Sequence, residues 1–267
     1  MPHRLDQTFA RLKEAREGAL VAFITAGDPS PEGTPALVAA LAGAGADVVE
    51  LGIPYSDPLA DGPSIQASSQ RALEKGVTPD TVLGMVRDIR ALTPVPLVLM
   101  TSYNLALKYG LERFAQVFSD AGADGAILTD LPPEEAGPWK AAADAHGMAT
   151  IFLVAPTSTP ERIALIAQNA TGFVYCVSRT GVTGARTELP AELKELLARI
   201  RAATDKPVCV GFGISQPEHV RQVIENADGA AIGSALVDFL HAHADNPNQA
   251  AELTRLVASW KKATRRA

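Results

Sequence analysis

The sequence contains eight short apolar runs, and longer stretches of helical character separate them. The runs occupy residues 19–25, 47–53, 96–101, 125–130, 149–154, 172–178, 207–213 and 229–234. None alternates cleanly between apolar and polar residues, which is the pattern expected of parallel strands that are covered on both faces. Many of the intervening stretches begin with Pro or Thr-Pro and end with Gly or Asn, as helices commonly do.

Eight strands that alternate with helices predict an α/β fold, a single-domain (β/α)8 barrel of the TIM type. The alternative is an open doubly wound sheet. The eightfold count and the lack of a G-x-G-x-x-G motif after the first run favour the barrel. Residues 1–18 are charged and amphipathic, so we expect an extra N-terminal helix rather than a signal peptide. No linker interrupts the pattern, and residues 1–267 are expected to form one domain.

Composition excludes several classes of function. The net charge of -6 and the pI of about 5.4 argue against a nucleic-acid partner, because phosphates require a basic face. No apolar run is long enough to span a membrane. Cys176 and Cys209 both lie within apolar runs, and no metal-ligand spacing is present. We therefore expect a metal-free cytoplasmic protein whose two thiols are buried and reduced.

Two segments, "AGAGADVVELG" and "SDAGADGAILTD", resemble each other. We interpret the likeness as an echo of how barrels are built and not as a modular repeat.

Acidic residues lie where the second strand ends. In a barrel of this kind the active site forms at the carboxyl ends of the strands. Glu50 lies inside the apolar run "VVELGI", where a merely buried carboxylate would be costly, and Asp57 and Asp61 follow in the next loop. Apolar neighbours should raise the pKa of Glu50, and Asp61 would be a second carboxylate in a different environment. The alternatives are that Glu50 forms an ion pair with a neighbouring basic side chain and that Asp57 only forms a turn.

Glycines mark the ends of the seventh and eighth strands. Gly211, Gly213 and Gly233 would let a ligand approach the backbone closely, and Ser234 could begin a short helix. A helix N-terminus with free N–H groups is a ready anion site, and barrels commonly hold phosphate at these two strands. The alternative is that the glycines only make tight turns.

The segment "SRTGVTGART" at 178–187 follows the sixth strand. Gly181 and Gly184 could act as hinges of a lid, and Thr183 could bond a catalytic carboxylate when the lid closes. A plain surface loop is the alternative.

Four segments in this order resemble the tryptophan synthase alpha chain family. They are "FITAGDP" at 23–29, "VELGIPYSDPLADGPSIQAS" at 49–68, "SRTGVTG" at 178–184 and "GFGIS" at 211–215. The resemblance covers nearly the whole chain, and the second segment is long and specific. It implies a lyase of tryptophan biosynthesis that cleaves indole-3-glycerol phosphate to indole and glyceraldehyde 3-phosphate, reversibly and without a cofactor in this chain.

The resemblance also implies roles for individual residues. Glu50 matches the acid/base at the breaking bond, and Asp61 matches the partner of the indole N–H. Thr183 matches the lid residue that orients this aspartate. The remaining matches are substrate contacts. Phe23 matches a residue that packs on the indole, and Tyr175 matches one that lies beside Glu50 and the substrate. The matches to the phosphate cradle are Gly184, Gly213, Gly233 and Ser234, and those to the pocket lining are Phe212 and Ile232.

The family works with a beta subunit as an αββα heterotetramer. Pro54 and Asp57 match loop positions near that interface, and pyridoxal phosphate would belong to the partner. One departure concerns "LMTSYN" at 99–104, where the family usually has an aromatic residue two positions before the Asn. Here Ser102 occupies that position and Tyr103 follows, so a ring contact is expected to be missing or shifted.

Two other functions remain open. Another phosphate-binding barrel of amino-acid biosynthesis would need a different acid/base set, with Lys or Cys near the strand ends. A non-catalytic relative could be retained to activate a beta subunit, although the intact Glu50, Asp61 and Thr183 argue against it.

Overall fold

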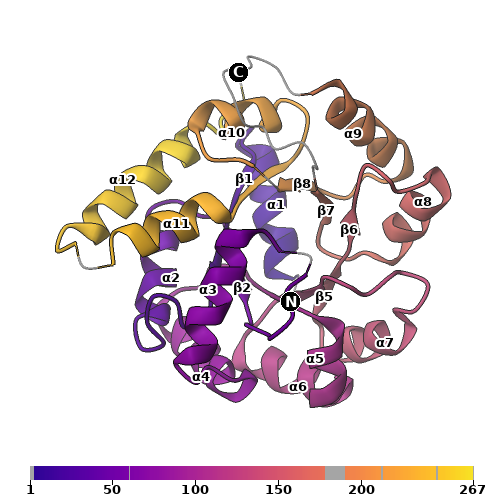
Figure 1. Ribbon diagram of the computed structural model, residues 1–267. Helices are drawn as coiled ribbons and strands as arrows, with labels where there is room; N and C mark the ends of the chain where they lie inside the picture. Colours follow the sequence, from indigo (N-terminus) through magenta and orange to yellow (C-terminus); the bar gives the residue numbers. More distant parts are fainter. Residues whose placement is uncertain (1–2, 60, 178–189, 212, 245, 267) are drawn as a thin grey trace.

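The strands form a closed ring, shown in the computed structural model of Figure 1. The structure describes residues 3–59, 61–177, 190–211, 213–244 and 246–266. In chain order the strands are β1 (Ala19–Thr25), β2 (Val48–Gly52), β3 (Leu97–Thr101), β4 (Gly125–Leu128), β5 (Ala149–Ile151), β6 (Leu153–Val154), β7 (Val174–Val177), β8 (Val208–Gly211) and β9 (Gly229–Ile232).

Helices surround this ring (Figure 1). In chain order they are α1 (Arg4–Glu14), α2 (Thr34–Gly43), α3 (Pro63–Glu74), α4 (Pro79–Leu92), α5 (Tyr103–Tyr109), α6 (Leu111–Ala121), α7 (Gly137–Ala145), α8 (Pro160–Asn169), α9 (Ala191–Ala203), α10 (Pro217–Ile224), α11 (Ser234–Ala242) and α12 (Gln249–Lys262). Proline at the first or second position begins several of them, as the sequence predicts.

All neighbouring strands are parallel, in the order β5-β4-β3-β2-β1-β9-β8-β7-β6. The fifth predicted strand is divided at Phe152, and its two parts face different neighbours. β5 pairs with β4, whereas β6 pairs with β7, and the Tyr175 N–H donates to the Phe152 carbonyl at 3.0 Å. This strand therefore closes the ring, and the predicted (β/α)8 barrel is confirmed.

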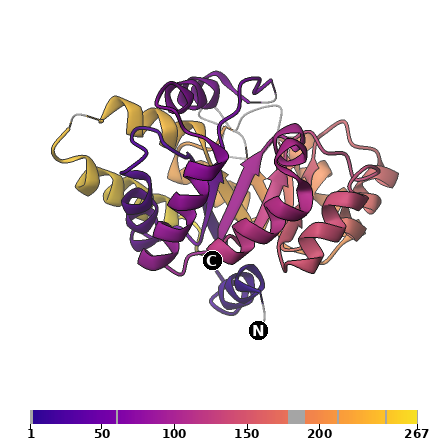
Figure 2. The ribbon, with the colours of Figure 1, turned by 90° about the horizontal axis from the view of Figure 1, so that it is seen from below.

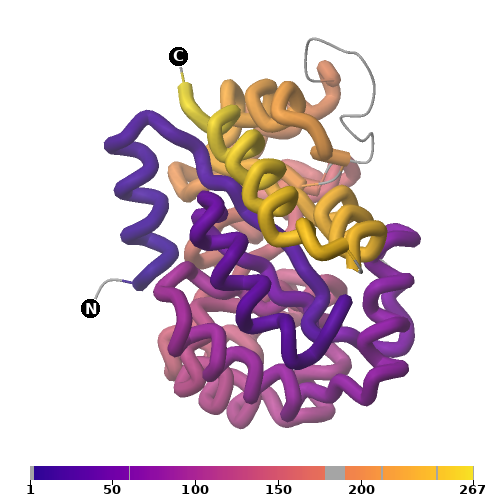
Figure 3. Tube along the Cα trace, turned by 90° about the vertical axis from the view of Figure 1, so that its left-hand side faces the viewer, coloured from indigo at the N-terminus to yellow at the C-terminus, as the bar shows by residue number. Residues whose placement is uncertain are grey.

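The core has two parts. One lies between the strands and the surrounding helices, and the other fills the inside of the barrel. The inner part includes Leu5, Phe9 and Leu12 of α1, which share one helix face because they are spaced by four and three residues. The predicted N-terminal helix therefore closes one end of the barrel with its apolar face (Figures 2 and 3). Each side chain of this size contributes about 1.5–3 kcal/mol when fully buried.

A repeated pair of hydrogen bonds ties adjacent strands together at this end of the barrel. The Asp124 N–H donates to the Leu97 carbonyl at 2.8 Å, and the Leu97 N–H donates back to Asp124 Oδ2 at 2.8 Å. We call this arrangement a strand-start clasp. The same two-way pairing joins Asp47 to Leu20, Thr171 to Thr150, and Asp228 to Val208.

The clasps explain why two segments of the sequence resemble each other, since Asp47 and Asp124 are the aspartates of the two look-alike stretches. The likeness extends to Thr171 and Asp228, and an alanine precedes each of the four residues. The four clasps lie before β2, β4, β7 and β9, which are every second strand of the eight-strand ring. The repeat unit is therefore two strands with their helices.

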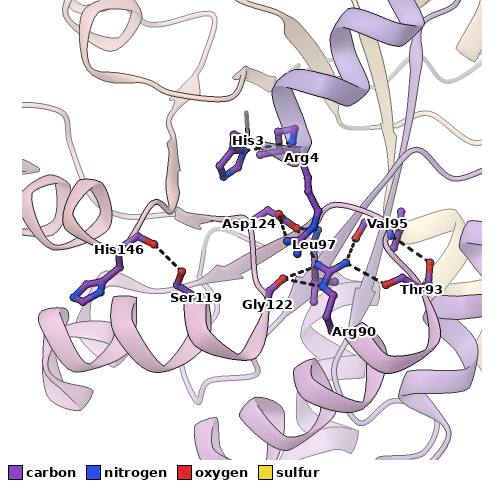
Figure 4. A network of polar contacts seen from close by, with 11 residues as sticks. His3, Arg4, Arg90, Thr93, Val95, Leu97, Ser119, Gly122, Asp124 and His146 are labelled. Atoms are coloured by element: carbon purple, nitrogen blue, oxygen red, sulfur yellow. Dashed lines mark hydrogen bonds and ion pairs between the residues drawn. The ribbon is translucent and has the colours of Figure 1, made fainter. Parts of the chain in front are cut away.

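Cations surround the three acidic clasps. Asp124 is paired with Arg4 at 2.7 Å and with Arg90 at 3.0 Å (Figure 4). Asp47 is paired with Arg11 and Lys261, and Asp228 with Arg201 and Arg266. Because Arg4 and Arg11 both belong to α1, this helix is joined to two clasps as well as to the inner core.

Candidate active site

Glu50 occupies the middle of β2 and points into the barrel. Its neighbours Val49 and Leu51 belong to the outer core, so the alternation of the strand directs Glu50 inward. The side chain is fully buried, and neither carboxyl oxygen has a hydrogen-bond partner among the described residues. Burial raises the pKa of Glu50 to about 8. Glu50 therefore carries a proton at neutral pH.

Asp61 lies between β2 and α3 and faces the same cavity as Glu50. Burial raises the pKa of Asp61 to about 6, and hydrogen bonding by Tyr55 offsets part of this effect. At pH 7 most of Asp61 is therefore ionised. One cavity thus holds a protonated carboxyl group and an ionised one.

The cavity has a volume of about 320 Å³ and a largely apolar wall. Phe23 of β1 lies beside Glu50 in the register of the two strands, and Tyr175 of β7 lines the opposite part. Burial raises the pKa of Tyr175, so its phenol stays protonated. A Cβ atom at Gly211 would lie 2.1 Å from the Tyr175 hydroxyl oxygen, which explains why glycine ends β8.

Gly213, Gly233 and Ser234 form one side of the cavity. Gly213 has a φ of 77°, a left-handed conformation that favours glycine. Gly233 caps α11 without a side-chain hydrogen bond, and no acidic residue lies in the first turn of this helix. Free N–H groups and the helix dipole make this end of α11 suitable for an anion.

Four predicted site residues have other outcomes. Thr183 and Gly184, with the predicted lid at 178–187, and Phe212 lie outside the described residues. Ile232 belongs to the outer core and not to the cavity wall, because the inward position on β9 is taken by Ala231.

Several wall residues were not predicted from the sequence. They include Met100, Thr129, Leu153, Val177 and Ile65. For Met100 the signal exists, because Glu50 pairs with Val98 and the next inward position is two residues later. Ile65 belongs to α3, and its approach to the cavity depends on how that helix packs across the barrel end.

A second cavity of about 850 Å³ lies beside the first, and Thr129 lines both. Its wall contains Pro54 and Asp57, the two positions predicted to lie near a partner, and Leu59, which is 91% exposed. Ser102 also lines this second cavity, and its hydroxyl caps α5 by accepting a hydrogen bond from the Leu105 N–H at 3.3 Å.

Tyr103 does not replace the aromatic residue that is missing at position 102. Its ring packs against the outer core and lines neither cavity. The ring at position 103 therefore does not take the place of the missing one, and Ser102 itself lines the second cavity.

Within the described part of the chain, no group of three or more His, Cys, Asp or Glu residues is arranged to hold a metal ion. No helix among the described residues is long and apolar enough to cross a membrane. Cys176 and Cys209 are buried and free, as the sequence predicts.

The model of the family described as tryptophan synthase alpha chain matches residues 9–265. This chain belongs to that family. The tryptophan synthase alpha chain of Geobacter sulfurreducens is 53% identical over 264 residues, which are 99% of this chain and 98% of the relative. The tryptophan synthase alpha chain of Solibacter usitatus is 49% identical over 91% of each chain.

Solved structures agree with the family assignment. Tryptophan synthase subunit alpha from Legionella pneumophila superposes with a TM-score of 0.91 at 41% identity, with 99% of each chain covered. A chain of Mycobacterium tuberculosis tryptophan synthase also has a TM-score of 0.91, at 37% identity and with 100% of each chain covered. The tryptophan synthase alpha chain family is a lyase family of tryptophan biosynthesis with a beta-subunit partner, so the predicted enzyme class is confirmed.

Proposed function

We propose that this chain cleaves indole-3-glycerol phosphate to indole and glyceraldehyde 3-phosphate, with Glu50 as the acid/base and Asp61 as the partner of the indole ring nitrogen. The observation that carries the assignment of roles is the pair of carboxyl groups in opposite protonation states within one cavity. Such a pair suits a reaction that needs both a proton donor and a fixed negative charge.

Glu50 donates one proton to the substrate and accepts another from it. Its carboxyl group protonates the indole carbon that carries the glycerol chain, and this leaves a Glu50 carboxylate and a positive charge on the ring. The carboxylate then accepts the proton of the adjacent substrate hydroxyl as the carbon–carbon bond breaks. The bonding electrons return to the ring, the hydroxyl carbon becomes the aldehyde, and Glu50 is protonated again.

Asp61 would stabilise the positive charge that the indole ring carries after protonation and before the carbon–carbon bond breaks. An ionised carboxylate that accepts a hydrogen bond from the ring N–H stabilises the positive charge of the protonated indole. The partial burial of Asp61 strengthens this interaction, because little water screens it. Phe23 and Tyr175 would hold the ring between them.

The phosphate of the substrate would bind at Gly213, Gly233 and Ser234. Backbone N–H groups at the start of α11 supply donors, and no cationic side chain lines this cavity among the described residues. Three further roles stay predictions: Gly184 in the phosphate cradle, Phe212 in the pocket lining, and Thr183 as the lid residue that orients Asp61.

The beta subunit would bind beside the second cavity and complete an αββα assembly. Pro54, Asp57 and the exposed Leu59 lie there, so an apolar surface adjoins the proposed active site. No cofactor is proposed for this chain, and pyridoxal phosphate would belong to the partner. The free, buried cysteines are compatible with the reducing cytoplasm.

An assay of indole release from indole-3-glycerol phosphate, with and without a beta subunit, tests the proposal. Asp61→Asn keeps the shape but removes the charge, so we expect a rate loss of at least about 10²-fold. Asp205→Asn, an exposed loop aspartate at the other end of the barrel, is the matched control and should leave the rate unchanged. No indole from the unaltered chain, even with a beta subunit present, would identify a non-catalytic relative.

A further inference from the structure

Gln66 of α3 reaches back to the loop that carries Asp61. Its side-chain Nε2 donates to the Asp61 carbonyl oxygen at 2.8 Å and to the Pro58 carbonyl oxygen at 3.2 Å. A side-chain amide has two N–H donors, and both are used on the backbone of this loop. The two acceptors lie on either side of the turn, so Gln66 spans it.

The loop itself is held by turn bonds. The Asp61 N–H donates to the Pro58 carbonyl at 3.0 Å, and the Leu59 N–H donates to the Asp57 carbonyl at 2.8 Å. The loop follows the end of β2, so no strand ladder fixes these residues. A side chain that bonds to both the Pro58 and Asp61 carbonyl groups therefore adds to the few turn bonds that hold the Asp61 backbone.

α3 provides a fixed base for this bridge. Ser68 and Thr25 of β1 share a buried hydrogen bond of 2.6 Å. Arg71 forms a two-point ion pair with the buried Asp28, at 2.8 and 2.7 Å. Ser64 donates to Asp238 of α11 at 3.0 Å. These bonds join α3 to the barrel and to the helix that begins at the proposed phosphate site.

We propose that Gln66 is a positioning residue for Asp61: it holds the carbonyl groups of Pro58 and Asp61 so that the Asp61 carboxylate faces the substrate ring. The inference rests on the proposed role of Asp61. Gln66 does not itself line the cavity, and it acts through the main chain of Asp61, which does. Catalysis depends on such placement, because small displacements of a reacting group lower the rate strongly.

Two replacements of Gln66 and one control separate this role from general destabilisation. Gln66→Ala removes the bridge, and Ala is a good helix residue, so α3 should persist. Gln66→Glu keeps the shape but has no donor at neutral pH. Gln70→Ala, one turn further along α3, removes a surface bond to Glu74 and serves as the matched control.

Amide hydrogen exchange and kinetics are both measured, with indole-3-glycerol phosphate as substrate. In both Gln66 variants the Leu59 and Asp61 amides should exchange faster, and kcat should fall about tenfold while KM changes little. Gln70→Ala should match the parent in both readouts. In an Asp61→Asn background, Gln66→Ala should cause no further loss, because the group that it positions is already disabled.

Unchanged exchange of the two amides, a parental kcat, or a normal rate in Gln66→Glu would each overturn the inference. So would an undiminished effect of Gln66→Ala in the Asp61→Asn background. A parental rate in Asp61→Asn alone would instead refute the proposed role of Asp61, and with it the catalytic part of this inference, even if the amides exchange faster.

Discussion

The two ends of the barrel treat buried carboxyl groups in opposite ways. At the end closed by α1, Asp124 is 3% exposed, accepts the Leu97 N–H and is paired with two arginines. Further along the barrel, in the middle of β2 and facing the cavity at the other end, Glu50 is 0% exposed and has no partner among the described residues. The first arrangement satisfies a charge and fixes the strands, whereas the second keeps a carboxyl group neutral and able to react.

This difference shows that burial alone does not identify a catalytic acid. Asp47, Asp124 and Glu50 are all buried, and all lie at or near strands. What distinguishes Glu50 is that its surroundings leave its hydrogen-bonding capacity unused, so a substrate can use it. The predictions below test whether this contrast holds in solution.

Replacing Glu50 should have the largest effect. Glu50→Gln removes the proposed proton donor without changing the shape, so indole release should fall by about 10⁴-fold, the upper end of the range for acid–base catalysis. The free energy of unfolding at neutral pH should not fall, because no partner is lost. Kinetics and a urea titration measure the two quantities, and a rate within tenfold of the parent would remove Glu50 from the mechanism.

The pH dependence of stability should report the same group. Native Glu50 keeps its proton up to a pKa of about 8, whereas an exposed glutamate loses it near 4.5. The native state therefore binds more protons in this window, and its free energy of unfolding should fall as the pH rises from 4.5 to 8, by roughly 5 kcal/mol from this residue. The difference between parent and Glu50→Gln isolates this contribution, and two parallel pH curves would contradict it.

Asp124→Ala should have a smaller but purely structural effect. The change leaves the Leu97 N–H without its acceptor and removes the carboxylate that pairs with Arg4 and Arg90, so we expect a loss of about 3 kcal/mol in the free energy of unfolding. The exposed Asp120 of α6 is the matched control, with an effect of Asp120→Ala within about 0.5 kcal/mol. Because the clasp lies far from the cavity, kcat of the folded variant should stay parental.

The uncharged clasp should be the weakest. Thr171→Val removes the acceptor of the Thr150 N–H without leaving a charge unpaired, so a loss of about 1 kcal/mol is expected by the same titration. If this change destabilised the protein as much as Asp124→Ala, the paired cations would contribute little, and the contrast between the two ends would need revision.

Much of the fold could be predicted from the sequence, because apolar runs and the residues that begin and end helices are local signals. The eight runs became the eight strands of the ring, and the inward position of Glu50 followed from its place in β2. The role of Asp47 and Asp124 could not be derived, since each bonds a residue 27 positions earlier on a neighbouring strand. The sequence shows that their two segments are alike, but the cause of the likeness is a hydrogen bond between strands, which only the folded structure shows.

The site shows the same limit. In "GAAIGS" every residue is small or apolar, so the sequence does not reveal which positions face inward, and Ile232 was assigned to the pocket although Ala231 faces the inner core. The Gln66 bridge was also missed, because a glutamine on a helix carries no sign of the backbone that it contacts.

The helix at the N-terminus has a consequence at the opposite end of the molecule. Leu5, Phe9 and Leu12 close one end of the barrel. The inner core above them extends to Met100, Leu153 and Tyr175, which line the cavity at the other end. Removal of α1 would expose the inner core to water at that end. If water reached Glu50, its pKa would fall toward that of an exposed glutamate. The proposed proton transfer by Glu50 would therefore depend on the apolar packing of α1 at the opposite end of the barrel.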